Sequence, residues 1–334
     1  ELGPRDEIIM PPFTMTSCAA VCLFYGVVPV FVDIEKDYFC IDPKKIEEKI
    51  TKKTKAIMAV NLFGQSCDYT SLKKICSKHK LILIEDNAQA IGAKYKGKFL
   101  GTIGDIGGFS LNYHKHIHCG EGGIITTNNK KYYQKSTLIR NHGEYCHSIF
   151  KNISLVNVVG NNFRLVEISA AIAQSQLLKL KNLLKLRVQN SHYLIKNLKK
   201  IKCIHFPGIR KNSTHSFYLI PFIYNKNVMK CKRETFVNFI NNKVKRKNNG
   251  ENILASGYVK PIYKQDIYIK KIGIGKKKFP FENNINYKNE KCNVAEKMYS
   301  SKLILLNSNF PKLTKMDLNY IINVFLNAYK KFKK

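Results

Sequence analysis

The sequence predicts an α/β protein in which helices cover both faces of a mainly parallel sheet, followed by a smaller α+β domain. Two observations lead to this fold class. Over residues 7–127, short apolar runs alternate with amphipathic helical segments, as parallel strands joined by helical crossovers do. After residue 200 this alternation stops, and a strand is expected at 216–224 and helices at 234–240 and 316–331. We therefore expect a large domain over residues 1–200 and a small C-terminal domain over 201–334.

The strands of the expected sheet are apolar runs bounded by turn residues. They lie at 7–10, 27–34, 55–62, 81–84, 106–111 and 123–127. Ser17 is expected to cap a helix that ends before Gly26, and Asp42-Pro43 to open a helix over 44–50. Further helices are expected at 70–79 and 163–200, and a polar loop at 241–251.

In parallel sheets, ligands bind at the carboxyl ends of the strands. Asp86 follows the expected strand at 81–84, and Ser110 lies at the end of the strand at 106–111. The sequence therefore predicts a ligand site around Asp86 and the segment that follows Ser110.

The net charge of +34 is of the size found in nucleic-acid-binding proteins. However, Lys and Arg total 57, and only seven of them are Arg, the residue that phosphate and base readers use for bidentate contacts. We interpret the charge as compositional and expect no specific nucleic acid partner. Nucleic-acid binding remains an alternative, which predicts tight binding with a steep dependence on salt.

With 44% hydrophobic residues the chain has an ordinary globular composition. It has no apolar run of about 20 residues, so no membrane span is expected, and no basic-then-apolar leader. The ten Cys form no CxxC pair, which indicates buried thiols in a reducing compartment. We expect a cytoplasmic protein, and, because the sequence does not begin with Met, we expect N-terminal residues to be missing.

The segment GDIGGFSLNYHKHIHCGEGG (104–123) is the richest in chemistry. Lys115 lies there between an expected strand and a Gly-rich turn, where partial burial would lower its pKa and make it a usable nucleophile. Pyridoxal phosphate needs a lysine, an acidic partner for its ring nitrogen and donors for its phosphate, and Asp86 ends a neighbouring strand. In a chain with so many lysines, an ordinary surface lysine is the alternative.

Alternating His114, His116 and His118 flank Lys115, and alternation places them on one side of an extended segment. No carboxylate or cysteine cluster joins them at ligand spacing, so we predict no metal site.

Seven segments carry a resemblance to a known family. They are DEIIMPPFTMTS (6–17), GVVPVFVDI (26–34), KAIMAVNLFGQSCD (55–68), LIEDNAQAIGA (83–93), GDIGGFSLNYHKHIHCGEGG (104–123), GNNFRLVEISAAI (160–172) and, more weakly, GYVKPIY (257–263). In this order they resemble the DegT/StrS-type sugar aminotransferases, enzymes of fold type I that use pyridoxal 5′-phosphate. The resemblance runs from residue 4 nearly to the end of the chain.

The resemblance implies roles for five residues. Lys115 matches the lysine that forms the Schiff base (aldimine) with the cofactor and, once freed, moves protons as base and acid. Asp86 matches the carboxylate that faces the pyridine nitrogen, and Gln89 the amide near the phenolic oxygen. Ser110 matches a phosphate-binding hydroxyl. Asn162 matches an asparagine that reaches the phosphate in the neighbouring subunit, which implies a homodimer with shared active sites.

Three further residues are candidates, Met15 and Arg164 through the same resemblance and Glu121 through its place in the Gly-rich turn. Met15 stands where the family commonly has an aromatic ring stacked on the cofactor, and a thioether covers that face with weaker stacking. Arg164, in the same motif as Asn162, has either a substrate-contacting or a structural role. Glu121, in GEGG, is either structural or near the site.

The activity that the resemblance implies is transfer of an amino group from glutamate or glutamine to a nucleotide-linked keto-deoxysugar. A related alternative is sugar dehydration with pyridoxamine phosphate, but those enzymes carry His in place of the lysine, and here Lys115 is present. The other alternative is a non-catalytic or truncated remnant, because the sequence lacks the family's N-terminal Gly-Ser/Thr turn that binds the phosphate.

Overall fold

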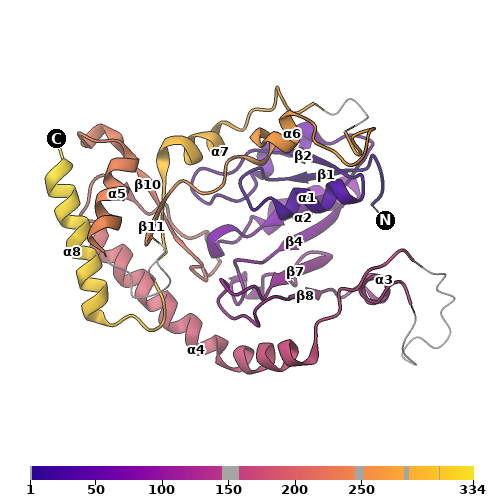
Figure 1. Ribbon diagram of the computed structural model, residues 1–334, viewed down its shortest axis with the longest axis horizontal. Coiled ribbons are helices and arrows are strands. Elements are labelled where there is room, and N and C mark those ends of the chain that lie inside the picture. Colours follow the sequence, from indigo (N-terminus) through magenta and orange to yellow (C-terminus); the bar gives the residue numbers. More distant parts are fainter. Residues whose placement is uncertain (1, 145–157, 245–251, 282–285, 308) are drawn as a thin grey trace.

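The computed structural model describes residues 2–144, 158–244, 252–281, 286–307 and 309–334. Its larger sheet has six strands in the order β2-β1-β3-β4-β7-β8 (Figure 1). In this sheet β2, β1, β3, β4 and β7 are parallel to one another, and β8 runs antiparallel to β7. They are β1 (Glu7–Met10), β2 (Val28–Phe31), β3 (Thr54–Val60), β4 (Ile82–Asp86), β7 (Ile106–Ser110) and β8 (Gly123–Thr126). The predicted fold class is confirmed, and each predicted strand of this sheet is present.

Helices cover both faces of this sheet because successive strand residues point to opposite sides. Ile8 and Met10 of β1 pack with α1 (Ser17–Phe24), whereas Ile9 between them packs with α2 (Tyr69–His79). A short hairpin, β5 (Lys94–Tyr95) and β6 (Lys98–Phe99), lies between β4 and β7 in the chain.

Two local predictions are corrected. Thr16, and not Ser17, occupies the N-cap position of α1, because a turn bond from Cys18 N to Met15 O already starts the helical path before Ser17. Residues 44–50 form two short 3₁₀ turns and no α-helix: η1 (Pro43–Lys45) and η2 (Glu47–Lys49). Asp42 does cap the first turn, but Ile46 and Ile50 are the only apolar residues of 44–50, too few for the apolar stripe of a longer amphipathic helix.

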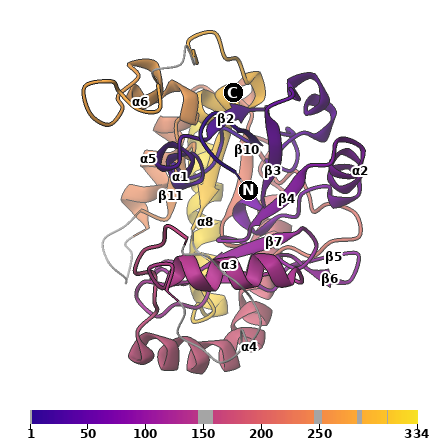
Figure 2. The ribbon, with the colours of Figure 1, turned by 90° about the vertical axis from the view of Figure 1, so that its right-hand side faces the viewer.

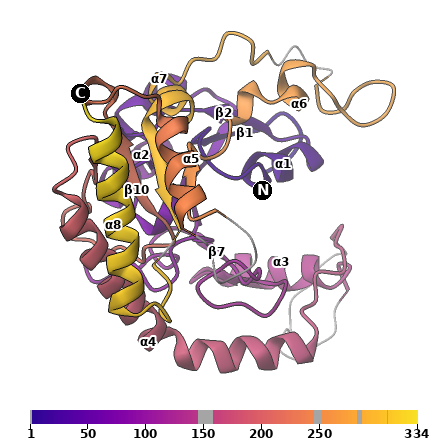
Figure 3. The same cartoon turned by 60° about the vertical axis from the view of Figure 1, so that its left-hand side comes forward.

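After β8 the chain passes through α3 (Lys130–Arg140) into the 32-residue α4 (Glu167–Leu198). Figures 1 and 3 show α4 running from the β8 side of the larger sheet to α8 (Lys315–Phe332). The C-terminal residues of α4 are buried against the second core, but its N-terminal half leaves apolar side chains exposed. Helical periodicity predicted this helix, but not which of its faces stays uncovered.

The second sheet is antiparallel, in the order β11-β12-β10-β9. Its strands are β9 (Ile204–His205), β10 (Ile220–Tyr224), β11 (Leu254–Ser256) and β12 (Leu303–Leu306). Helix α8 and α5 (Arg233–Lys243) pack on it. Of the predicted loop at 241–251, residues 241–243 belong to α5, and 245–251 lie outside the described residues.

Part of the C-terminal half returns to the larger sheet. The short helices α6 (Asp266–Ile269) and α7 (Asn293–Lys297) lie beside β1 and β2 (Figure 1). Tyr263 and Tyr268 contact Phe31 of β2, with ring centroids 5.8 and 5.9 Å away. One hydrophobic core therefore contains residues from both sides of position 200, and the division into 1–200 and 201–334 stays a prediction.

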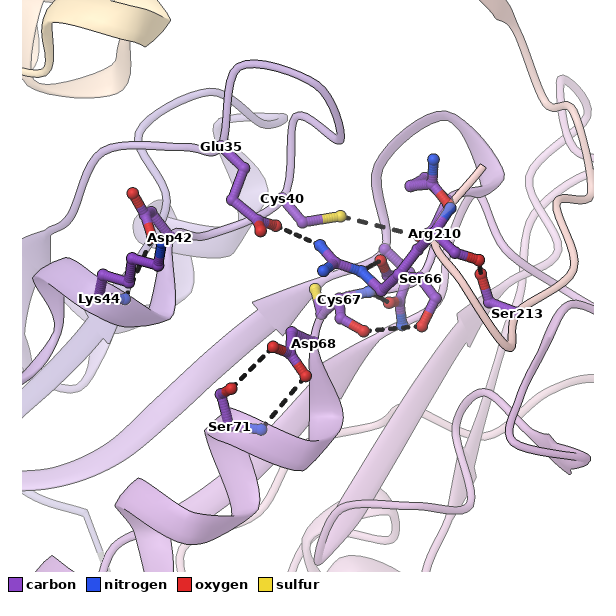
Figure 4. A network of polar contacts seen from close by, with 12 residues as sticks. Glu35, Cys40, Asp42, Lys44, Ser66, Cys67, Asp68, Ser71, Arg210 and Ser213 are labelled. Atoms are coloured by element: carbon purple, nitrogen blue, oxygen red, sulfur yellow. Dashed lines mark hydrogen bonds and ion pairs between the residues drawn. The ribbon is translucent and has the colours of Figure 1, made fainter. Parts of the chain in front are cut away.

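Arg210 connects the start of the C-terminal half to loops of the larger sheet (Figure 4). Its guanidinium forms an ion pair with Glu35, donates from Nε to Ser66 O at 2.9 Å and lies 4.1 Å from the Tyr38 ring centroid. Figure 2 shows α3 near β7, at the end of the larger sheet opposite to β2.

Candidate active site

Asp86 lies at the carboxyl end of β4, between two parallel neighbours. The register pairs it with Val60 of β3 on one side and with Gly108 of β7 on the other. Asp86 Oδ1 accepts a hydrogen bond from Ala88 N at 2.9 Å, and Oδ2 accepts one from the Cys18 thiol at 3.0 Å. The carboxylate is therefore held from both sides, with lone pairs left for a further donor.

Lys115 lies in the loop that follows β7, where its backbone N–H donates to Asn112 O at 2.9 Å. The side chain is half-buried, and its Nζ lies 5.0 Å from the ring centroid of Tyr218. Burial lowers the pKa of the Lys115 ammonium, while the negative charge of Asp86, and that of a Cys18 thiolate, would oppose this shift. The Asp86 carboxylate is thus near enough to the Lys115 ammonium to act on its charge.

Gln89 is buried, and both ends of its amide are hydrogen bonded. Oε1 accepts from Phe63 N at 2.8 Å, and Nε2 donates to the Tyr258 hydroxyl at 2.8 Å. The Tyr258 ring in turn contacts Phe13 and Phe63 edge-on. These contacts set which way the amide faces and leave one Nε2 hydrogen for another acceptor.

Ser110 and Met15 are close in the chain to residues of this site. Ser110 ends β7, two residues after Gly108, the register partner of Asp86, and its Oγ accepts from Asn112 N at 3.3 Å. Met15 directly precedes α1, is 47% exposed, and its carbonyl accepts from Cys18 N. Glu121 is exposed and accepts from Asn112 Nδ2 at 2.6 Å, so it contacts the loop that carries Lys115.

Asn162 and Arg164 lie apart from this group. Both are exposed, in the segment that leads into α4. Arg164 Nη1 donates to Asn141 Oδ1 at 2.7 Å, and its backbone N–H to Asn162 Oδ1 at 3.3 Å. In the part of the chain that the structure describes, neither residue contacts Lys115 or Asp86.

The histidines around Lys115 do not share one side, and that prediction is wrong. The segment is a series of turns, so His114 and His118 are exposed while His116 is buried. His116 Nε2 lies 3.0 Å from Ser216 O, which makes Nε2 the protonated nitrogen, and Nδ1 has no hydrogen-bond partner among the described residues. Burial, assisted by the Arg187 cation, lowers the pKa of His116 to about 3, so the ring is neutral.

The described residues contain no cluster of three His, Cys, Asp or Glu arranged to hold a metal ion. Nine cysteines are described; all are free thiols, and all except Cys231 are buried, in agreement with the predicted burial. Cys146 lies outside the described residues. Among the helices that the structure describes, none combines the length and apolar character needed to cross a bilayer.

Sequence reasoning missed three residues of this site. Cys18 was assigned only as a buried thiol, and the contact that it makes with Asp86 comes from the packing of α1 on β4. Tyr218 lies in a run of apolar residues that predicts only a strand. Tyr258 belongs to the weakly matching segment GYVKPIY, the one signal in the sequence that pointed to it.

The sequence profile of the DegT/DnrJ/EryC1/StrS aminotransferase family matches residues 1–325. The chain is 30% identical over 326 residues to the uncharacterized protein MJ1066 of Methanocaldococcus jannaschii, covering 96% of this chain and 78% of that one. It is 33% identical over 222 residues to a GDP-perosamine synthase of Escherichia coli O157:H7. It is 38% identical over 220 residues to a dTDP-3-amino-3,6-dideoxy-alpha-D-galactopyranose transaminase of Aneurinibacillus thermoaerophilus. Each of these two matches covers 66% of this chain and 59% of the enzyme.

Solved structures share the fold. An aminotransferase from Psychrobacter cryohalolentis superimposes with a TM-score of 0.86 at 25% identity, covering 98% of this chain and 82% of that one. NtdA from Bacillus subtilis, solved with bound cofactor PMP, has a TM-score of 0.79 at 26% identity, covering 98% of this chain and 69% of that one.

Proposed function

The chain belongs to the DegT/DnrJ/EryC1/StrS aminotransferase family, and we propose that it transfers an amino group from glutamate or glutamine to a keto-deoxysugar carried on a nucleotide. The observation that carries this proposal is the pair of Lys115 and Asp86 at the carboxyl edge of the larger sheet. A half-buried lysine with a lowered pKa, next to a carboxylate held by two donors, is the arrangement that amino-transfer chemistry needs.

Pyridoxal 5′-phosphate is the cofactor of this family, and the residues present here fit it. Asp86 has lone pairs free for a ring N–H, and Gln89 has one amide hydrogen free for an oxygen acceptor. Ser110 would contribute a hydroxyl to the phosphate, and Met15 would cover one face of the ring. When bound, the cofactor supplies an aldehyde that accepts the amino group and a ring that withdraws electrons from the reacting carbon.

The work of the protein's own residues follows from their environments. The Lys115 amine, within reach of the charge of Asp86, would take up a proton and release it within the site, and burial lowers its pKa, which favours the release. Asp86 would accept the N–H of the ring nitrogen, and the Ala88 N–H and the Cys18 thiol keep its oxygens oriented for this. The Gln89 amide accepts from Phe63 N and donates to the Tyr258 hydroxyl, so these three residues hold one side of the site together.

We also propose that the working form is a homodimer with shared active sites. Large apolar side chains gather on β8, on the segment before α4 and on the first half of α4, where an isolated chain would expose them to water. They include Ile125 (59% exposed), Phe163 (58%), Val166 (63%), Ile168 (76%) and Leu178 (85%). A second copy would bury this face and would carry Asn162 and Arg164, which lie on the same segment, into its partner's site.

The substrate class has further support in the chain's charge. A nucleotide diphosphate sugar is an anion, and a protein with a net charge of +34 attracts anions over its whole surface. Two relatives are named as a GDP-perosamine synthase and a dTDP-3-amino-3,6-dideoxy-alpha-D-galactopyranose transaminase. The free thiols of the nine described cysteines fit a reducing compartment, and we propose a cytoplasmic location.

An absorbance titration tests this function. The purified chain is mixed with pyridoxal phosphate, and glutamate is then added. A band near the edge of the visible range that appears with the cofactor and collapses with glutamate is the expected result. The absence of any band would contradict cofactor binding by this chain, and a band that glutamate leaves unchanged would contradict the amino donor.

A further inference from the structure

Tyr218 lies against the reactive amine of the site. The Lys115 Nζ is 5.0 Å from the centroid of its ring, within the range in which an aromatic face attracts a cation. Tyr218 comes from the segment that leads into β10 of the second sheet, whereas Lys115 follows β7 of the first. The contact therefore joins the two sheets at the site.

The segment that carries Tyr218 is bonded to the site on its other side too. Ser216 O accepts from His116 Nε2, at 3.0 Å, and His116 is the residue next to Lys115. Ser216 Oγ donates to Gln89 O at 3.2 Å, and its backbone N–H donates to Gly64 O at 3.1 Å. Ser216 is thus tied both to the Lys115 loop and to the residue assigned to the cofactor's phenolic oxygen.

Phe217, between Ser216 and Tyr218, is fully buried with a φ of 49°, a backbone conformation that costs a non-glycine residue free energy. Hydrogen bonds from the buried Arg187 of α4 offset this cost. Its Nη1 donates to Phe217 O and to Tyr218 O, each at 3.3 Å. Asn309 Nδ2 also donates to Phe217 O, at 2.7 Å. Such a heavily restrained turn presents the next side chain, Tyr218, in one direction.

We propose that Tyr218 is a positioning residue for the Lys115 amine: its ring attracts the protonated form and holds Nζ beside Asp86. The proposal rests on the function proposed above, because it gives Lys115 its catalytic role. It adds a residue that belongs to none of the motifs through which that role was assigned.

Other groups also affect the protonation of Lys115, and their effects must be distinguished from the effect of the Tyr218 ring. Asp86 from β4 favours the ammonium form, as would a Cys18 thiolate from α1, while burial disfavours it. His116 is neutral, and the Arg187 cation, which acts on His116, is bonded to Phe217 O. With these groups unchanged, removal of the aromatic face takes away one attraction for the ammonium, so the pKa of Lys115 falls.

The test uses the full chain without cofactor, so that it does not depend on aminotransfer. Acetic anhydride labels the neutral amine, and mass spectrometry of the peptide that contains Lys115 gives the pH midpoint of labelling. Tyr218→Met, which fills much of the volume without a π face, is expected to lower the midpoint by about 0.4 to 1.5 pH units, the equivalent of a cation–π contact. Tyr218→Phe, which keeps the ring, is expected to leave the midpoint close to that of the wild type. An unchanged midpoint in Tyr218→Met overturns the proposal.

A second comparison separates the ring's charge distribution from its shape, and it does not depend on the folding of Tyr218→Met. Pentafluorophenylalanine at position 218 has nearly the shape of phenylalanine but a reversed quadrupole. We expect a midpoint below that of Tyr218→Phe, and equal midpoints would overturn the attraction.

The holoenzyme gives a further readout. Tyr218→Met is expected to lower kcat more than it raises KM for glutamate, since the ring acts on the amine and not on the donor. If the midpoint shifts but no variant, nor the wild type, transfers an amino group, the proposed function fails while the contact between Tyr218 and Lys115 stands.

Discussion

The Cys18 thiol donates a hydrogen bond to Asp86 Oδ2 at 3.0 Å, so that a residue of the first helix orients the carboxylate at the end of the fourth strand. Burial raises the pKa of this thiol well above its ordinary value, and the adjacent Asp86 charge raises it further. Cys18 therefore keeps its proton and acts as a donor, not as a nucleophile.

Replacement of Cys18 by Ala removes that donor, and we expect the affinity for pyridoxal phosphate to fall by about 10- to 150-fold, the scale of a hydrogen bond to a charged group. Cys18→Ser keeps a hydroxyl donor of similar size and is expected to stay within about threefold of the wild type. A fluorescence titration measures both. Equal losses in the Ser and Ala variants would show that packing, and not hydrogen bonding, accounts for the effect.

Lys115→Ala is expected to lower the rate of the glutamate half-reaction by about 10²- to 10⁴-fold, because the variant has lost the amine that moves the proton. After borohydride treatment, mass spectrometry of the wild type should find the cofactor attached to the peptide that contains Lys115. Lys94→Ala is the matched control, because Lys94 also lies over an aromatic ring, 4.4 Å from the Phe99 centroid, but outside the site. Cofactor fixed by borohydride in Lys115→Ala would show that another lysine has the role.

Leu178→Glu puts a charge on the apolar face of α4, where this side chain is 85% exposed in the single chain. If a second copy covers this face, burial of the carboxylate should weaken the dimer by at least about tenfold. Light scattering coupled to size-exclusion chromatography measures the mass. Met316→Glu, at a side chain 78% exposed on α8, is the control and should leave the mass unchanged. Wild-type protein that is monomeric at all concentrations would contradict the interface.

Arg210→Met leaves the Glu35 carboxylate without its cation, and we expect the free energy of unfolding to fall by about 2 to 4 kcal/mol at pH 7.5. Burial already raises the pKa of Glu35, with Arg210 opposing the shift. A raised carboxyl pKa in the folded state contributes stability at low pH that disappears as the pH rises through the folded value. The loss in Arg210→Met should therefore shrink as the pH is lowered toward 5.

Urea denaturation at the two pH values measures this difference. Lys270→Met breaks the exposed pair of Lys270 with Asp266 and should have little measurable effect. A loss in Arg210→Met that is the same at both pH values would mean that Glu35 is not the group responsible.

Much of the fold could be predicted because its signals are local. The strands of the larger sheet are apolar runs, and their alternation with helices leads to parallel crossovers. The segment at 44–50 could not be predicted correctly, because a cap followed by proline shows where a helical turn opens and not how far the helix continues. The side-by-side placement of His114, His116 and His118 failed because extended geometry was assumed where the chain turns.

The sequence by itself determined the sheet, the family resemblance and the identity of Lys115, Asp86 and Gln89 as candidates, because each of these depends on residues close together in the chain. Tertiary structure alone decided that Cys18 bonds Asp86, that Tyr258 bonds Gln89 and that Tyr218 lies against Lys115. These contacts join elements far apart in the sequence, and they depend on how two sheets pack around one site. That packing is a property of the whole core, and no local pattern encodes it.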